Sequence, residues 1–388
     1  MKRIACTLFL ILLSGCATTA VDQSSIAQRA RALFNDAAFT PPAEKVDATQ
    51  IFAVSDAMRR YLQVDIAPQL QSMGYLRGLI DALYSKQHLK IDYDAELTRT
   101  AAQTFDARVG NCLSLVIMTA ALSKQLGLRV YYQRVAVEET WTRAGGLYFA
   151  SGHVNITLGR VQSELRMGHR DDSLLTIDFY PQAVTRRALT WSLEESTIVA
   201  MYFNNRAAEA LAKGDINQAY WWTREAILAD ASFVNSYNTL GVVYRRRGDL
   251  LAAEAALMLA SAIDASNLHV MSNLAIVLNE QGRLDEALAL NQKIDRLRPE
   301  PPFHFFNAGM AALERGELHS ARSLFAKEVE RAPYSGEFHY WLGVAHARLG
   351  EVARARAHLA LALEYSATRK EHAIYAAKLD FLQASRLH

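Results

Sequence analysis

Cys112, His153 and Asp178 are the residues whose types and order point most directly to chemistry. A cysteine thiolate is a strong nucleophile, and an imidazole beside it can take and return a proton. A carboxylate can fix which imidazole nitrogen carries that proton. Such a set attacks an amide carbonyl, releases an amine and leaves a thioester. Water as the acceptor makes the reaction a hydrolysis and a second amine makes it a transfer; the sequence leaves both open.

Cys112 is the one cysteine of the predicted folded part, because Cys6 lies in an apolar leader and Cys16 ends that leader. In an exported protein a single thiol is an inert core residue, an intermolecular bridge or a reactive group. Cys112 follows Asn111, a good N-cap residue, and precedes an apolar helix predicted over 113–126. In the first turn of that helix, unpaired N–H groups and the helix dipole favour the thiolate, and thus the reactive alternative.

The elements that must position these residues are predicted to form an α+β domain over residues 51–199. Apolar residues at three- and four-residue spacing predict helices over 51–61, 69–84 and 95–105. Beta-rich segments predict strands over 128–137, 147–158 and 174–179, with a hairpin turn near 143–146. His153 then lies in the second strand and Asp178 in the third.

This order of a helix-borne cysteine and two strand-borne partners resembles the transglutaminase-like superfamily, which is circularly related to papain-type cysteine proteases. The resemblance rests on the Gly110-Asn111-Cys112 turn, the apolar helix ending in Leu126-Gly127-Leu128, and the two later strands. It implies Cys112 as the nucleophile, His153 as its base and later acid, and Asp178 as the group that orients the imidazole. The Asp178-Phe179 pair departs from the Asp-Pro that is more usual in the family.

A carbonyl under attack also needs donors for its oxyanion. The backbone N–H of Cys112 is one candidate, and the candidate side chains for this role or for substrate contact are Trp141, Gln133 and Asn111. No pair of cysteine or histidine residues has the spacing of metal ligands, so neither a metal nor a cofactor is expected.

The C-terminal half contains five glycines at a period of 34 residues, each followed five positions later by an alanine. The glycines are Gly214, Gly248, Gly282, Gly316 and Gly350. This pattern resembles the tetratricopeptide repeat (TPR), and Leu240-Gly241 with Tyr244 matches the first helix of its motif. An all-α solenoid is therefore predicted, with repeats over 200–233, 234–267, 268–301, 302–335 and 336–369. A last helix over 370–388 is expected to cover its end.

Arrays of this kind bind peptides or partner proteins along a concave surface. The inner-helix positions predicted to line that groove are Asn204, Asn235, Asn238, Arg245, Asn279, Phe303, Phe306 and Tyr340. The mixture of amides and aromatic rings suits an extended peptide, and the partner is expected to be a polypeptide. Residues 182–199 have little linker composition, so we expect the two domains to pack rigidly.

Residues 1–16 are a short basic start, an apolar run and Leu13-Ser14-Gly15-Cys16. This segment resembles a bacterial lipoprotein signal, which implies cleavage before Cys16 and a lipid on its thiol. The absence of aspartate at position 17 suggests retention at the outer membrane, facing the periplasm. Residues 17–50 are polar and alanine-rich and are predicted to be a tether from the membrane, with a short helix near residues 26–34.

The net charge of +2, with acidic and basic residues interspersed, provides no basic stripe for nucleic acid. Two hypotheses of function remain. The first is a lipid-anchored periplasmic enzyme with a cysteine nucleophile, either a peptidase or amidase or an acyltransferase, whose repeats recruit a polypeptide. The second is a non-catalytic envelope scaffold that binds proteins through its repeats.

Overall fold

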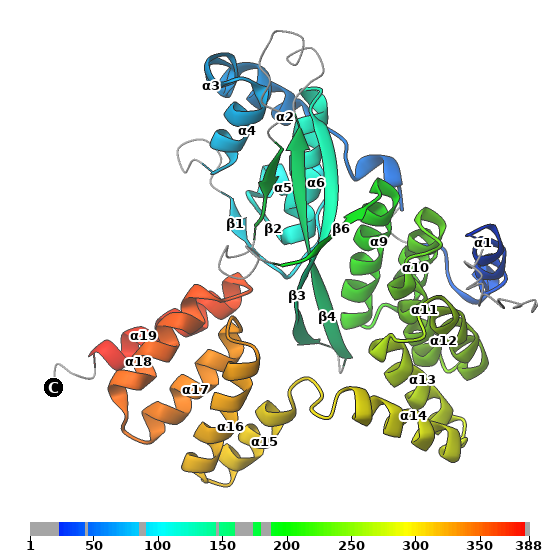
Figure 1. Ribbon diagram of the computed structural model, residues 1–388, viewed down its shortest axis with the longest axis vertical. Coiled ribbons are helices and arrows are strands. Elements are labelled where there is room, and N and C mark those ends of the chain that lie inside the picture. Colours follow the sequence, from blue (N-terminus) through cyan, green and yellow to red (C-terminus); the bar gives the residue numbers. More distant parts are fainter. Residues whose placement is uncertain are drawn as a thin grey trace, which may run out of the picture.

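A computed structural model describes residues 23–42, 46–84, 91–144, 147–159, 174–179 and 188–384. The predicted leader and the lipidation site at Cys16 lie outside the described residues. An N-terminal unit of helices and strands is followed by a curved array of helices (Figure 1). None of the helices in the described part of the chain is long and apolar enough to cross a membrane.

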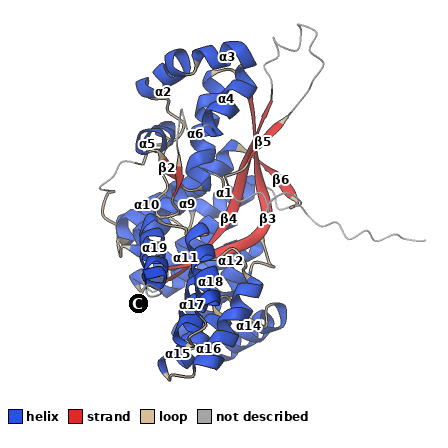
Figure 2. Cartoon of the chain, turned by 90° about the vertical axis from the view of Figure 1, so that its left-hand side faces the viewer, coloured by secondary structure: helices blue, strands red, loops and turns tan. Residues whose placement is uncertain are grey.

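The N-terminal unit is built on a four-stranded antiparallel sheet in the order β5-β4-β3-β6. Its strands are β3 (Arg129–Ala144), β4 (Leu147–Gly159), β5 (Leu175–Ile177) and β6 (Thr190–Leu193). The outer strands are short: β6 pairs with β3 only over Tyr132–Val135, and β5 pairs with β4 only over Ile156–Leu158. Figure 2 shows these strands grouped together with helices α4 and α6 beside them.

Beyond the outer strands, β3 and β4 continue as a two-stranded ribbon. The pairing register shifts between Val135 and Thr140, and pairing then resumes from Thr140 with Ser151 to Ala144 with Leu147. A bulge of this kind bends and twists a ribbon. We call residues 140–144 and 147–151 the arm. Strand β3 is longer than predicted because the sequence beyond residue 137 is polar and lacks the alternation that predicts strands.

Helix α6 (Cys112–Gln125) is the centre of this unit, and its residues 113–123 are all buried. A helix that is apolar on every side must be surrounded by other elements. The C-terminal end of α6 turns at Gly127, whose φ of +72° favours glycine, directly into β3. Strand β3 begins directly after the end of α6, and the antiparallel β4 ends opposite this point, because Gly159 pairs with Arg129.

The helices before α6 differ from the predicted ones. The predicted helix over 69–84 is two helices, α3 (Ala67–Met73) and α4 (Tyr75–Tyr84), because Gly74 at φ +78° interrupts it. The predicted helix over 95–105 begins later, as α5 (Ala101–Ala107), because Thr100 and Gln103 form a capping box that fixes its start. The other elements are α2 (Asp56–Arg60), the π-helical η3 (Tyr61–Asp65), the 3₁₀ helix η2 (Ala48–Gln50) and the parallel strands β1 (Asp92–Tyr93) and β2 (Val109–Gly110).

The array consists of antiparallel helix pairs. The paired helices, in chain order, are α9 (Glu195–Ala212), α10 (Ile216–Ala229), α11 (Val234–Arg247), α12 (Leu250–Ile263), α13 (Leu268–Glu280), α14 (Leu284–Leu297), α15 (His304–Glu314), α16 (Leu318–Arg331), α17 (Gly336–Arg348) and α18 (Val352–Glu364). The last helix, α19 (Arg369–Ala384), follows the fifth pair. Each of the five periodic glycines has φ between +75° and +90° and makes the turn within its pair.

The array is interrupted between α14 and α15, where its apolar core divides in two. Buried residues from the N-terminal unit through Ala287 form one cluster, and buried residues of α15, α16 and α17 form a second. Three leucines of α14 (Leu284, Leu288 and Leu297) are 56–60% exposed. Residues 298–303 carry three prolines, so α14 cannot continue as a helix through this segment.

The prediction of a tether over 17–50 is wrong for residues 23–42. Helix α1 (Gln23–Arg31) buries Ile26 and Ala30 in the first core. After the short η1 (Asp36–Ala38), Phe39 stacks on Tyr220 with ring centroids 3.8 Å apart. The Tyr244 hydroxyl donates to the Leu33 carbonyl at 2.5 Å. The alanine-rich composition concealed these anchors, which pack the segment against the first two helix pairs.

The curved array returns to the N-terminal unit at its far end (Figure 1). The Ala95 N–H donates to the Ala367 carbonyl at 2.8 Å, and the Arg369 guanidinium lies 3.5 Å from the Asp92 carboxylate. Both ends of the array are thus attached to the domain that carries Cys112, and the arm points into the curve between them.

The close packing of the repeat helices can be tested by a graded series of glycine substitutions. A Cβ at Gly241 would lie 2.6 Å from Leu257 Cγ, whereas one at Gly343 would lie 3.0 Å from Leu359 Cγ. We expect Gly241→Ala to destabilise the protein by about 1–2 kcal/mol, because overpacking of about 1–3 kcal/mol exceeds a helix-propensity gain of about 1 kcal/mol. Gly343→Ala should be close to neutral in thermal unfolding. A larger loss of melting temperature for Gly343→Ala than for Gly241→Ala would contradict this packing.

Candidate functional site

The three residues predicted to act together meet at the start of α6. Asp178 directly follows β5, and its Oδ1 lies 2.6 Å from Nε2 of His153 on β4. The other carboxylate oxygen accepts a hydrogen bond of 3.1 Å from Asn155 Nδ2. His153 is 4% exposed, so the pair is held away from bulk water. Two donors fix the carboxylate, and the carboxylate fixes the imidazole.

The charge state of His153 depends on its burial and on its two neighbours, Asp178 and Cys112. Burial of the ring lowers the pKa of His153, but hydrogen bonds with Asp178 and Cys112 and the attraction of both groups outweigh burial. The net effect raises the pKa from 6.5 to about 9. The imidazole is therefore protonated at neutral pH, which is the state that stabilises a neighbouring thiolate and can protonate a leaving amine.

Cys112 is the first residue of α6, and its side chain is half-buried. Asn111 caps the helix by accepting the Ser114 backbone N–H at 2.9 Å and the Ser114 hydroxyl at 2.8 Å. A Cβ at Gly110 would lie 2.9 Å from Ser114 Cβ and 3.0 Å from Thr104 Cγ2, so the turn into the helix requires glycine. The local sequence thus places the thiol among the N–H groups of the first helical turn.

The same cap is connected to the repeat array through Thr98. The Asn111 amide donates to Thr98 Oγ1 at 2.9 Å, and the Thr98 N–H donates to Glu209 Oε1 of α9 at 2.6 Å. Burial raises the pKa of Glu209, although the hydrogen bond from Thr98 and the attraction of Arg206 oppose that rise. A continuous set of polar contacts therefore runs from the cysteine helix to the first repeat.

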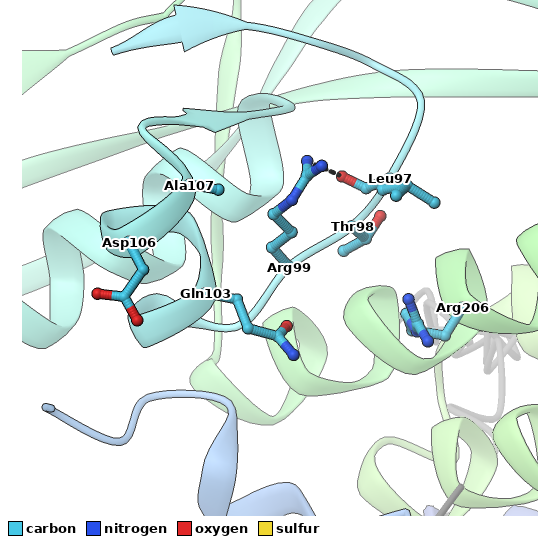
Figure 3. A pocket seen from close by; sticks show the side chains of 7 residues that line it. All are labelled: Leu97, Thr98, Arg99, Gln103, Asp106, Ala107 and Arg206. Carbon is cyan, nitrogen blue, oxygen red and sulfur yellow. Dashed lines mark hydrogen bonds between the residues drawn. The ribbon is translucent and has the colours of Figure 1, made fainter. Parts of the chain in front are cut away.

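A surface hollow of about 580 Å³ lies beside this connection. Figure 3 shows its lining side chains, Leu97, Thr98, Arg99, Gln103, Asp106, Ala107 and Arg206, around the junction of the α5 region with α9. None of the three triad residues lines this hollow, so it is a feature of the domain junction rather than of the thiol site.

The predicted oxyanion side chains occupy three different places. The Asn111 side chain is engaged as the helix cap, and Gln133 accepts a hydrogen bond from Thr157 Oγ1 at 3.2 Å within the sheet. Trp141 lies in the arm, with its ring centroid 4.9 Å from that of His269 on α13. The prediction for Trp141 is therefore corrected, because the extension of β3 carries its indole to the array. The Cys112 backbone N–H is still a candidate donor.

The predicted groove residues also separate into groups. Phe303 and Phe306 are each 1% exposed in the second core, so the prediction that they line an open groove is wrong for the arrangement seen in this structure. Asn204 accepts a hydrogen bond from Thr239 and Asn238 accepts one from Asn273, so these amides join successive repeats. The remaining candidates comprise exposed Asn235 and Asn279, Arg245 paired with Glu280 at 2.9 Å, and Tyr340 stacked on Tyr375 at 4.8 Å.

Asn155 and Thr98 are the residues of the site that the sequence interpretation missed. Asn155 stands two positions after His153, and residues two apart in a strand lie on the same face. That spacing was a usable signal. Thr98 had no signal, because its role depends on the folding of residues 94–100 against both α6 and α9.

A further polar cluster in the last repeat consists of three histidines. His339 Nδ1 lies 3.1 Å from His358 Nδ1, and the rings of His346 and His358 stack with centroids 5.4 Å apart. Burial lowers the pKa of His358 to about 4, aided by repulsion from the other two rings. Within the described residues no group of three or more histidine, cysteine, aspartate or glutamate side chains has the geometry to hold a metal ion.

Family models of the tetratricopeptide repeat match residues 234–267, 268–294 and 306–369. The helical array is therefore a TPR solenoid, in agreement with the period of 34. The matches lie within the array and do not reach the N-terminal unit. None of the curated proteins compared with the chain matches it by sequence.

Several solved structures resemble part of the chain. They include pilF of Pseudomonas aeruginosa, at 21% identity over 49% of this chain and 94% of that chain with a TM-score of 0.27. YrrB, a TPR protein with an unusual peptide-binding site, is 23% identical over 46% of this chain and 92% of that chain, with a TM-score of 0.25. MamA of AMB-1 is 22% identical over 43% and 91%, with a TM-score of 0.25.

Replacing the carboxylate should move the titration of His153. Because the folded pKa of about 9 exceeds the unfolded value of 6.5, the stabilisation from this group is fully present below pH 6.5 and is lost as the pH rises to 9. In Asp178→Asn we expect the His153 pKa to fall by about 1–3 units, as when an opposite charge is removed. The measurement is an NMR titration of the imidazole together with unfolding curves between pH 6 and pH 10.

The matched control is Asp285→Asn, on the first turn of exposed α14, which should leave the titration of His153 unchanged. An unaltered His153 pKa in Asp178→Asn would show that the carboxylate does not hold the imidazolium.

Proposed function

We propose that the N-terminal unit is a transglutaminase-like domain in which Cys112 attacks an amide carbonyl of a polypeptide. The observation that carries the proposal is the position of His153, which is buried, bonded to Asp178 at 2.6 Å, and close enough to Cys112 for the thiol to raise its pKa. A helix N-terminus, an imidazolium and an orienting carboxylate are the three supports that a nucleophilic thiolate requires. The TPR solenoid adds a surface of the kind that generally binds peptides or partner proteins.

The proposed reaction proceeds in two halves. The Cys112 thiolate forms a C–S bond to the carbonyl carbon, and the oxyanion accepts hydrogen bonds, one of them from the Cys112 backbone N–H. The C–N bond then breaks as His153 gives its proton to the departing amine, which leaves a thioester on Cys112. Neutral His153 next takes a proton from water or from a second amine as it attacks the thioester. Attack by water yields an acid, attack by an amine yields a new amide, and the thiolate is restored.

A second candidate function is a scaffold that binds partner proteins without catalysis. The family comparisons favour this candidate, because they match the repeats alone. The two candidates share the partner-binding array and differ only in whether the thiol reacts. For either one we propose attachment to the bacterial envelope through a lipid on Cys16, based on the leader sequence.

Activity-based labelling separates the two candidates. We expect a thiol-directed electrophile to modify Cys112 rapidly at neutral pH in the full chain, and Cys112→Ala to lose both that label and any cleavage or transfer of peptide amides. In His153→Ala the labelling rate should fall by about 10²–10⁴, the usual contribution of a positioned acid–base group. The measurement is the second-order rate of modification followed by mass spectrometry of the Cys112 peptide.

His319→Ala is the matched control, because His319 is an exposed histidine on α16, and its labelling rate should equal that of the wild type. If Cys112 reacts no faster than a free thiol, and partner capture from membrane extracts is unchanged in Cys112→Ala, the scaffold is the correct function.

A further inference from the structure

The arm is attached to the repeat array through two aromatic contacts. The Trp141 ring of β3 meets His269 at the start of α13, with centroids 4.9 Å apart. The Tyr148 ring of β4 meets Phe303 before α15, with centroids 5.7 Å apart. His269 and Phe303 stand on opposite sides of the interruption between α14 and α15. The arm therefore spans the place where the array lacks its own repeat-to-repeat packing.

The surface that receives the arm is a built feature of the array. Phe303 is 1% exposed and packs edge-on against Phe306 and Phe338. Its φ of +62° lies in the left-handed region that bulky side chains rarely adopt. Trp141 packs against the same second core. We call this combination of His269, Phe303 and the adjoining second core the arm site.

The arm itself is weakly supported by its own domain. Among the described strands, none pairs with the ribbon beyond the bulge, because β6 ends its pairing at Val135 and β5 at Ile156. A two-stranded ribbon without a third strand is marginally stable in water. Tyr148 is 55% exposed although it touches Phe303, so its contact is a partial one. An arm of this kind is suited to docking and release.

We propose that the arm site is the position where the array binds a partner polypeptide, and that the arm is an internal occupant which the partner must displace. The segment seated on the site defines the chemistry of the partner, namely an extended or ribbon segment that presents aromatic side chains. The proposal does not depend on a reactive Cys112, because its contacts lie in the arm and in α13–α15.

The test uses a fluorescent cyclic peptide of residues 137–151 as the probe and the full chain as the receptor. The double variant Trp141→Ala/Tyr148→Ala releases the arm and should bind the probe more than about tenfold more tightly than the wild type, in which docking reduces the available fraction of the site. Adding His269→Ala to the double variant should abolish the gain. Fluorescence anisotropy gives the affinities, and circular dichroism with thermal unfolding checks that each variant is folded.

Tyr131→Ala is the matched control, because Tyr131 is a 42% exposed aromatic residue on the same strand but outside the arm. It should bind the probe as the wild type does. Equal affinity of the wild type and the folded double variant, or no binding by either, overturns the proposal. A wild-type dimer that dissociates in the double variant also overturns it, because the occupant would then be the arm of a second copy.

Discussion

The start of α6 is the constraint on which the rest of the structure depends. The Asn111 side chain accepts a hydrogen bond from the Ser114 N–H in the first turn of the helix and donates one to Thr98. The Thr98 N–H in turn donates to Glu209 of the first repeat. Loss of an N-cap typically costs about 0.5–2 kcal/mol, but here the cap also sets the position of the thiol. Because a buried polar group without a partner is costly, each member of this set holds the others in place.

The two parts of the chain behave as one packed body rather than as an enzyme with a separate adaptor. The first core runs without a break from α1 through the sheet to Ala287 on α14. The N-terminal segment covers the outer side of the first repeats, and the far end of the array bonds to Ala95. Helix α9 is accordingly both the first repeat helix and a wall of the N-terminal unit.

The sequence predicted the fold correctly where the residue pattern was local or periodic. The five glycines predicted the TPR solenoid because each occupies a turn that requires a left-handed residue. The order of Cys112, His153 and Asp178 along the chain, through its resemblance to the transglutaminase-like superfamily, predicted a pair of partners, His153 and Asp178, that the structure brings together.

The predictions were wrong where contacts between residues far apart in the sequence determine the structure. Residues 23–42 have the composition of a polar tether, yet Phe39 stacks on Tyr220 of the first repeat. The Trp221 indole N–H likewise donates to the Thr40 carbonyl, across a sequence separation of 181 residues. Phe303 and Phe306 have the spacing of groove residues, but the interruption before α15 turns them into a core. Trp141 was a candidate oxyanion or substrate residue because the polar sequence after residue 137 does not show how far β3 extends toward the array.

Strand β4 joins the site to the arm through its register. His153, Asn155 and Thr157 alternate along β4 with Val154, Ile156 and Leu158, which belong to the first core. A slip of one residue would exchange these two faces, which would place the polar set in the first core without its hydrogen-bond partners and remove His153 from Asp178. The pairing of β4 with β3 extends past the bulge to Ala144 and Leu147, where the arm touches the array. The aromatic contacts of the arm therefore add to the forces that hold the register of the strand carrying His153.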